Sequence, residues 1–124
     1  MDREKFEWFV AKAVEDLPEE FLARLENIDV IVEDRPSVSQ VRRAGLRRGH
    51  TLLGLYEGIP QTRRGRGYGL VLPDKITIFQ KPIEDRCSNE AEIIAEIGRV
   101  VKHEIAHHFG SSDARLRQIE RGKD

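Results

Sequence analysis

Apolar residues recur with a helical period near the start of the chain. These residues follow one another at one, three or four positions along the chain, so that they share one helical face; they are Phe6, Phe9, Val10, Ala13, Val14 and Leu17. This pattern predicts an amphipathic helix over residues 3–16. Pro18 then ends this helix or opens a second short one, since proline is tolerated in a first turn. In that second helix we expect Phe21, Leu22 and Leu25 to face the core.

Later segments have the composition of β-strands. Residues 28–33 (IDVIVE) alternate and are rich in β-branched side chains, and residues 51–57 (TLLGLYE) and 75–80 (KITIFQ) predict two further strands. The glycine-rich residues 62–69 predict a loop that can lead into a fourth strand over residues 68–72.

Glycine, proline and paired arginines mark the connections between these strands. Residues 37–49 contain two arginine pairs and two glycines, and we interpret them as mostly loop. Pro73 and Asp74 predict a tight turn. Pro82 is expected to end the strand over residues 75–80.

A long apolar stripe predicts a helix over residues 89–109. Asn89 is a candidate N-cap with Glu92 three residues later, which is the pattern of a capping box. The stripe consists of Ile93, Ile94, Ile97, Val100, Val101 and Ile105. Gly110 fits the left-handed position after the helix, and a short helix over residues 113–121 follows. Helix, strands and helix in this order predict an α+β fold, with three or four strands beneath the long helix.

Composition limits the chain to one domain. The 124 residues are 39% hydrophobic and 35% charged, enough for a single core, so residues 1–124 form one domain. No stretch approaches the roughly 20 apolar residues of a membrane helix. The charged N-terminus does not resemble a signal peptide, and a single cysteine excludes an intrachain disulfide. We therefore expect a cytoplasmic protein.

The histidine-rich end of the long helix contains the candidate chemistry. In VKHEIAHHFGSSDARL, His103 and His107 lie four residues apart and Glu104 follows the first of them. A helix turns about 100° per residue, so the two imidazoles share one stripe and can reach a single ion. Glu104 can hold a water bound to that ion, which is the physical content of the H-E-x-x-H motif.

A helical wheel sharpens this interpretation. Glu104 and His108 fall near the centre of the apolar face, whereas His103 and His107 lie along one flank. A partly desolvated carboxylate has a raised pKa, which suits a group that takes and returns a proton near neutral pH. The alternative for Glu104 is a buried salt bridge with an arginine. For His108 we expect a buried, hydrogen-bonded imidazole facing the sheet.

A third ligand is needed for a catalytic metal. Gly110 lets the chain turn back, so that Asp113 can join His103 and His107, or Asp113 can instead cap the last helix. Two histidines, one carboxylate and an open fourth position suit catalytic zinc, Zn2+. Glu104 would then be the general base of a peptidase that uses a metal-activated water. His50 and Cys87 have no such context, and we expect Cys87 to be chemically inert.

The chain also resembles a known family. HEIAHHFGSSD resembles the extended zinc signature H-E-x-x-H-x-x-G-x-x-D. Together with LLGLYEGIP and VLPDKITIFQKPIED it is similar to the small bacterial zincin-like metallopeptidases, or minimal zincins, over roughly residues 27–120. The resemblance implies an N-terminal helix, a short mixed sheet and a metal-binding helix near the C-terminus. By the family motif, His103, His107 and Asp113 match metal ligands and Glu104 matches the base. The methionine turn of metzincins is missing, since Met1 is the only methionine.

The resemblance further suggests how a substrate binds. Zincin-like sites bind a peptide along an edge strand, and we assign that role to residues 67–72, with Tyr68, Gly69 and Leu70 as substrate-binding residues. The substrate would be a peptide or an unstructured protein segment. We further expect the neighbouring basic side chains to favour acidic peptides; these are Arg63, Arg64 and Arg66.

Two non-catalytic alternatives remain. The metal could staple the C-terminal helices together, although a structural zinc usually has four protein ligands and only three candidates are found. The arginines of residues 37–67 could bind nucleic acid, but aromatic residues for base stacking are sparse there, so this is the weaker interpretation.

Overall fold

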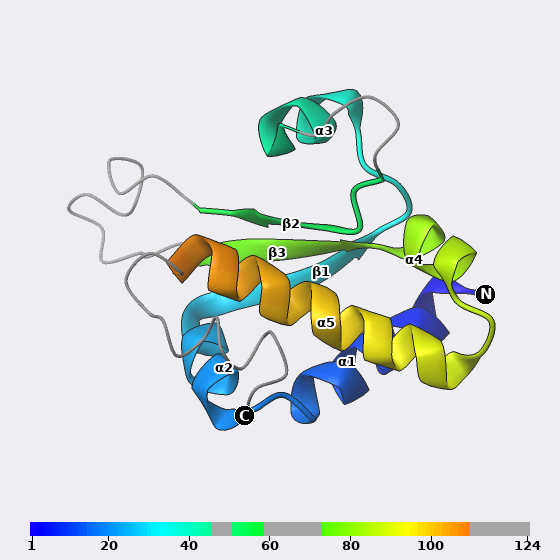
Figure 1. Cartoon of the computed structure of the whole chain (residues 1–124), viewed down its shortest axis with the longest axis horizontal. Coiled ribbons are helices and arrows are strands. Elements are labelled where there is room, and N and C mark those ends of the chain that lie inside the picture. The colour runs from blue at the N-terminus through cyan, green and yellow to red at the C-terminus, as the bar shows by residue number, and fades with distance from the viewer. Residues whose placement is uncertain (46–50, 59–72, 110–124) are drawn as a thin grey trace.

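A computed structural model describes residues 1–45, 51–58 and 73–109 of the chain. Within these ranges the elements are, in order, α1 (Arg3–Glu15), α2 (Glu19–Arg24), a 3-10 turn (Leu25–Asn27), β1 (Ile28–Glu33), α3 (Val38–Ala44), β2 (Gly54–Glu57), β3 (Asp74–Phe79), α4 (Gln80–Arg86) and α5 (Glu90–Phe109). Figure 1 shows α5 crossing in front of the strands, with α3 set apart beyond β2. The α+β arrangement of an N-terminal helix, a mixed sheet and a long helix is confirmed.

The described sheet has three strands in the order β1-β3-β2. β1 runs parallel to β3, with Val30 opposite Ile76, and β2 runs antiparallel to β3, with Leu55 opposite Thr77. In this sheet β3 is central, and β2 lies at the edge that faces the second half of α5 (Figure 1).

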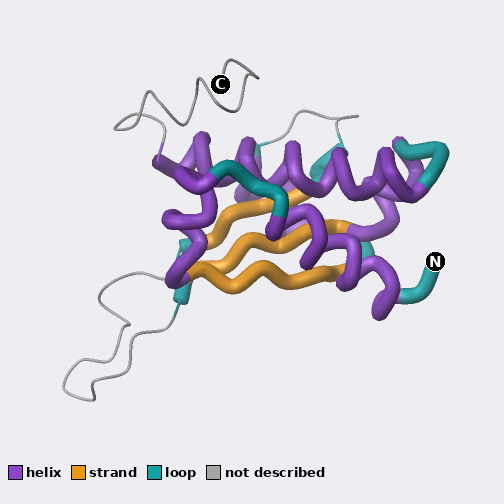
Figure 2. The backbone as a smooth tube through the Cα atoms, turned by 90° about the horizontal axis from the view of Figure 1, so that it is seen from below, coloured by secondary structure: helices purple, strands orange, loops and turns teal. Residues whose placement is uncertain are grey.

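The main core lies between the sheet and the helices α1, α2 and α5. Alternate residues of β3, Ile76 and Ile78, point into it and are fully buried. They meet the predicted apolar faces of the helices, whose fully buried members include Phe6, Phe21, Ile97, Val101 and Ile105. Figure 2 shows these helices packed along one side of the three strands.

A second, smaller apolar cluster fixes α3. Buried Leu52, Leu55 and Phe79 pack against Val41 and Ala44 of α3. Because Phe79 alternates with Ile76 and Ile78 along β3, this cluster lies on the opposite face of the sheet from the main core. The two clusters place α3 and α5 on either side of the β2 edge.

α3 contradicts the prediction that residues 37–49 are mostly loop. The Ser37 hydroxyl accepts a hydrogen bond from the Gln40 amide at 3.0 Å, and the Gln40 side chain accepts one from the Ser37 amide at 2.8 Å. This reciprocal pair is a capping box. Gly45 ends the helix with a left-handed φ of 70°.

Five smaller predictions need correction. The second strand begins at Gly54 rather than at residue 51, and β3 ends at Phe79 because Gln80 opens α4. Pro82 lies in the first turn of α4, where its missing N–H is tolerated. Asp74 is the first residue of β3. Leu22 is 38% exposed rather than turned into the core.

Several predicted features lie outside the described residues. These are the strand over residues 68–72 and its glycine-rich loop, Gly110, the helix over residues 113–121 and His50. Among the helices that the structure does describe, none is long and apolar enough to cross a membrane.

Candidate active site

The last two turns of α5 present the histidine motif. Asn89 caps the start of this helix by accepting the Glu92 amide at 2.9 Å, while the Glu92 side chain accepts from the Ser88 amide at 2.7 Å. Buried Ile97, Val101 and Ile105 then fix the rotation of the helix against the core. The predicted helix is confirmed, and its rotation determines where the motif residues point.

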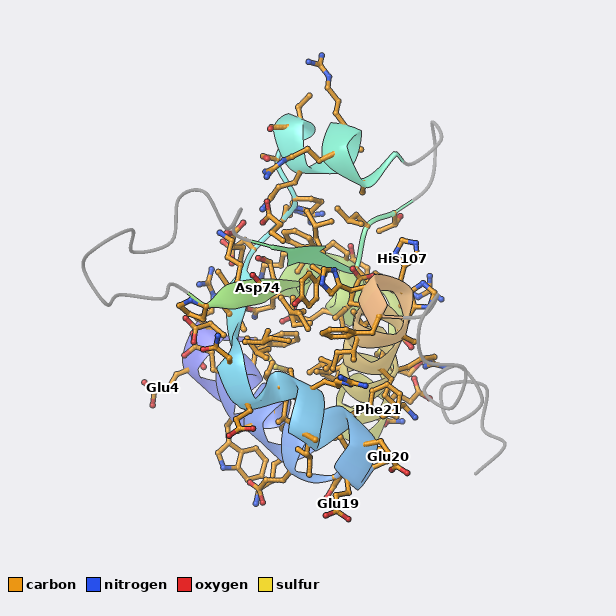
Figure 3. The ribbon with its side chains drawn as sticks, turned by 90° about the vertical axis from the view of Figure 1, so that its left-hand side faces the viewer. Glu4, Glu19, Glu20, Phe21, Asp74 and His107 are labelled. Carbon is orange, nitrogen blue, oxygen red and sulfur yellow. The ribbon has the colours of Figure 1, made fainter. Side chains whose placement is uncertain are left out.

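His103 and His107 lie on one exposed stripe. Their ring centroids are 6.2 Å apart and their planes differ by 7°. Two imidazoles bound to one tetrahedral zinc have centroids roughly 5 Å apart, since Zn–N bonds are about 2.1 Å. A modest rotation of the two exposed side chains therefore brings both rings onto one ion. Figure 3 shows His107 on the side of α5 that faces α3. The pair fits as two ligands of a metal.

Glu104 lies between the two histidines in sequence and is half-buried against β2. Its Oε1 accepts a hydrogen bond from the Tyr56 backbone N–H at 2.9 Å, across 48 residues of sequence. Burial raises the pKa of Glu104 above its ordinary value, although the Tyr56 amide and the two flanking histidines act in the opposite direction. Among the described residues no arginine is paired with Glu104, so the salt-bridge alternative receives no support.

Gly54 permits the contact between β2 and α5. A Cβ atom at this position would lie 2.5 Å from Val100 Cγ1 on α5 and 3.3 Å from the Thr77 carbonyl oxygen on β3. Glycine thus allows the strand to approach the helix closely enough for the Tyr56 amide to reach Glu104. The sequence does not identify Gly54 or Tyr56 as residues of the site. The one signal for Gly54 is a glycine within a strand pattern, which can mark a close approach of another segment.

Tyr56 organises this part of the site through three different groups. Besides its amide contact with Glu104, its hydroxyl donates to Asp74 Oδ2 at 2.7 Å. Its ring stacks on His108, with centroids 3.8 Å apart and planes 14° apart. His108 is nevertheless exposed, which contradicts the expected buried imidazole. The stack on Tyr56 covers one face of the imidazole and leaves the ring accessible from the cleft.

A cleft of about 550 Å³ opens at the β2 edge between α3 and α5. Its lining residues are Arg43, Ala44, Leu52, Gly54, Leu55, Tyr56, His103, Glu104, His107 and His108. A second hollow of about 400 Å³ shares Leu52, Gly54, His103 and Glu104 with it and continues along α5. The motif residues therefore border a space large enough for a peptide segment.

The third predicted ligand, Asp113, lies outside the described residues, as do Tyr68, Gly69 and Leu70 and the arginines Arg63, Arg64 and Arg66. Within residues 1–45, 51–58 and 73–109, no group of three or more histidine, cysteine or acidic side chains is arranged to hold an ion. The described part of the site thus contains two potential ligands and a carboxylate. Cys87 is half-buried outside this cleft, and burial raises the pKa of its thiol, in keeping with an inert cysteine.

Comparison with known proteins agrees with this arrangement. The model of the zincin-like metallopeptidase family matches residues 25–123. The chain belongs to this zincin-like metallopeptidase family. The match covers both sides of the cleft and the whole histidine motif.

A solved structure is similar to this family member as well. It is a conserved hypothetical protein from Thermo thermophilus, with 25% sequence identity and a TM-score of 0.54, and the match covers 89% of this chain and 95% of that chain. A comparison with curated proteins gave no match.

Proposed function

We propose that the protein is a zinc-dependent peptidase that hydrolyses a peptide or an unstructured protein segment. The observation that carries the proposal is the hydrogen bond between Glu104 and the Tyr56 amide, within a cleft that His103 and His107 also line. This bond holds the Glu104 carboxylate beside the exposed stripe that contains the parallel imidazoles of His103 and His107. A general base next to a metal requires this arrangement.

His103 and His107 would hold the zinc through ring nitrogens, with Asp113 as the proposed third ligand. When bound, the ion would polarise the scissile carbonyl and lower the pKa of a water molecule. Family membership and the donor set of two imidazoles support zinc.

Glu104 would move the proton. Its Oε1 already accepts the Tyr56 hydrogen bond, so a proton taken from water goes to Oε2 without breaking that bond. The raised pKa of the half-buried carboxyl favours holding the proton until it is passed to the leaving amine. The Tyr56 amide keeps the carboxylate in one orientation during both transfers.

The decisive experiment compares zinc content and peptide hydrolysis in the wild type and in Glu104→Gln. We expect Glu104→Gln to bind zinc like the wild type and to lose at least about a hundredfold in kcat, because loss of a general base typically costs 10²–10⁴-fold. Glu90→Gln is the matched control, since Glu90 lies at the exposed start of the same helix and pairs with Lys5.

Two results would contradict the proposal. Hydrolysis that is unchanged in Glu104→Gln would remove the assigned base. Stoichiometric zinc in the wild type, with no hydrolysis of any peptide in a diverse mixture, would instead favour a non-catalytic zinc that joins the C-terminal segments. In His103→Ala and His107→Ala we expect both zinc and activity to be lost.

A further inference from the structure

The wall of the cleft opposite the histidines is formed by α3. Arg43 and Ala44, in the last turn of this helix, line the same space as His103, Glu104 and His107. The floor between the two walls is β2 with Leu52 before it. Val41 and Ala44 of α3 pack on Leu52, Leu55 and Phe79, so this wall is held against the sheet.

Arg43 places a positive charge on this wall. Its Nη1 donates to Glu57 Oε2, and Glu57 Oε1 lies 3.8 Å from Lys75 Nζ. The three side chains together carry a net positive charge, since one carboxylate faces two cations. The Glu57 side chain is only 14% exposed whereas that of Arg43 is 57% exposed. Glu57 thus orients the guanidinium of Arg43, while more than half of the Arg43 side chain remains accessible.

The guanidinium keeps capacity for a further ligand. Arginine carries five N–H donors in a planar fork. Among the described residues, the contact of Arg43 with Glu57 uses Nη1. The remaining donors suit a second carboxylate, because arginine binds carboxylates through two parallel hydrogen bonds.

The two arginines of the neighbouring hollow differ from Arg43. Arg86 and Arg99 both pair with Glu96, whose side chain is 7% exposed, and each takes one of its two oxygens. A buried carboxylate held by two arginines is a compensated structural cluster. Among the described residues, Arg43 is therefore the arginine that lines the cleft together with His103, Glu104 and His107, whereas Arg86 and Arg99 line the neighbouring hollow.

We infer that Arg43 is a specificity-determining residue that selects a substrate with an acidic side chain at the position facing α3. The inference rests on the proposed peptidase function. A peptide lying along the β2 edge would present alternate side chains to opposite walls of the cleft. The aliphatic part of the selected side chain would pack on Ala44 and Leu52, and its carboxylate would accept hydrogen bonds from Arg43.

The test uses a set of otherwise neutral peptides in which one position at a time is Glu, Gln or Lys. Hydrolysis by the zinc-loaded wild type gives kcat/KM for each, and fluorescence anisotropy with Glu104→Gln gives the affinity without turnover. We expect one position to favour Glu over Gln by roughly tenfold in both measurements, the size typical of a charge-assisted hydrogen bond. Arg43→Met should reduce this ratio to about one.

Arg42→Met is the matched control, because Arg42 is the preceding residue of the same helix, is exposed and does not line the cleft. It should keep the wild-type ratio. Arg43→Lys, which retains the charge but lacks the fork, should give an intermediate ratio. Circular dichroism of each variant checks the fold, and Arg43→Lys is used in place of Arg43→Met if the latter does not fold.

The outcomes separate this inference from the proposed function. A Glu preference that survives Arg43→Met, or that disappears in Arg99→Met instead, overturns the inference. Hydrolysis without any acidic preference also overturns it, while the peptidase function stands. Binding with an Arg43-dependent Glu preference but no hydrolysis supports the role of Arg43 and contradicts the peptidase function.

Discussion

At the scale of single residues, the candidate site depends on the absence of a side chain at Gly54. The hydrogen bond from Tyr56 to Glu104 requires β2 to lie directly on α5. Gly54 makes this possible, since the nearest atom to a Cβ at that position is Val100 Cγ1, on a β-branched side chain with restricted rotamers.

We predict that Gly54→Ala lowers the free energy of unfolding by about 1–3 kcal/mol, the usual cost of forcing an extra carbon into a packed contact. It should also reduce peptide hydrolysis by displacing the Tyr56 amide from Glu104. Chemical denaturation and kcat/KM measure the two effects.

The double variant Gly54→Ala/Val100→Ala tests the cause, because it removes Cγ1 from the clash. Its loss should be smaller than the sum of the single losses. Gly58→Ala is the control, since the nearest atom to its Cβ would be Asp74 Oδ1 at an ordinary 3.7 Å. Additive losses in the double variant would contradict the steric explanation.

At the scale of elements, the two helices that form the walls of the cleft, α5 and α3, pack on apolar clusters of different size. α5 spans Glu90–Phe109 and packs on the main core, whereas α3 spans only Val38–Ala44 and packs on a small cluster of its own. Short helices are marginal without capping or tertiary contacts. The capping box of α3 is therefore important for the cleft wall.

We predict that Ser37→Ala destabilises α3 locally, by about 0.5–2 kcal/mol. The expected signature is faster amide hydrogen exchange in residues 38–44, with little change in α5. Ser39→Ala is the matched control because Ser39 is an exposed serine within the same helix. Equal exchange in both variants would show that the cap contributes nothing measurable.

At the scale of the whole molecule, one core joins the sheet to α1, α2 and α5. α5 packs on this core and presents His103 and His107 on its exposed side. Ile97 is fully buried at its centre. We predict that Ile97→Ala lowers the free energy of unfolding by about 2–5 kcal/mol, through lost transfer energy and a residual cavity. Denaturant unfolding measures this loss. Ile94→Ala, at a half-buried position of the same helix, should cost clearly less.

Ion pairs connect the ends of elements at the surface. Arg3 of α1 donates to Asp34, just after β1, at 2.8 Å, and this bond lowers the pKa of Asp34. A lowered folded-state pKa means that the stabilisation is present above the ordinary aspartate pKa and is lost as the pH falls through the lowered value. We predict that Asp34→Asn is slightly less stable than the wild type at neutral pH and that the difference vanishes in acid.

Urea unfolding at a series of pH values measures this convergence, and added salt should weaken the difference at neutral pH because both side chains are largely exposed. A difference that stays constant from neutral to acidic pH would show that the charge of Asp34 is not responsible.

The sequence by itself determined the elements whose signals are local. α1, β1 and α5 follow from uninterrupted periodic patterns, and the shared stripe of His103 and His107 follows from i,i+4 spacing on a helix. The sequence does not predict α3, because the arginine pairs and glycines of residues 37–49 favour a loop. Ser37 and Gln40 nevertheless have the spacing of a capping box. The sequence does not predict α4, because a proline after a strand pattern favours termination of the strand, whereas Pro82 lies in the first turn of a helix.

Only the tertiary structure decided what surrounds the motif. The Tyr56 amide on Glu104, the Tyr56 ring on His108 and Arg43 on the opposite wall join segments far apart in the chain. The helical wheel predicted that His108 faces the sheet, and its ring does stack on Tyr56 of β2. Its burial, however, depends on what the neighbouring segments cover, and Tyr56 covers one face of the ring only. Periodicity records which face of an element is apolar, whereas the partner of that face is set by how the elements pack together.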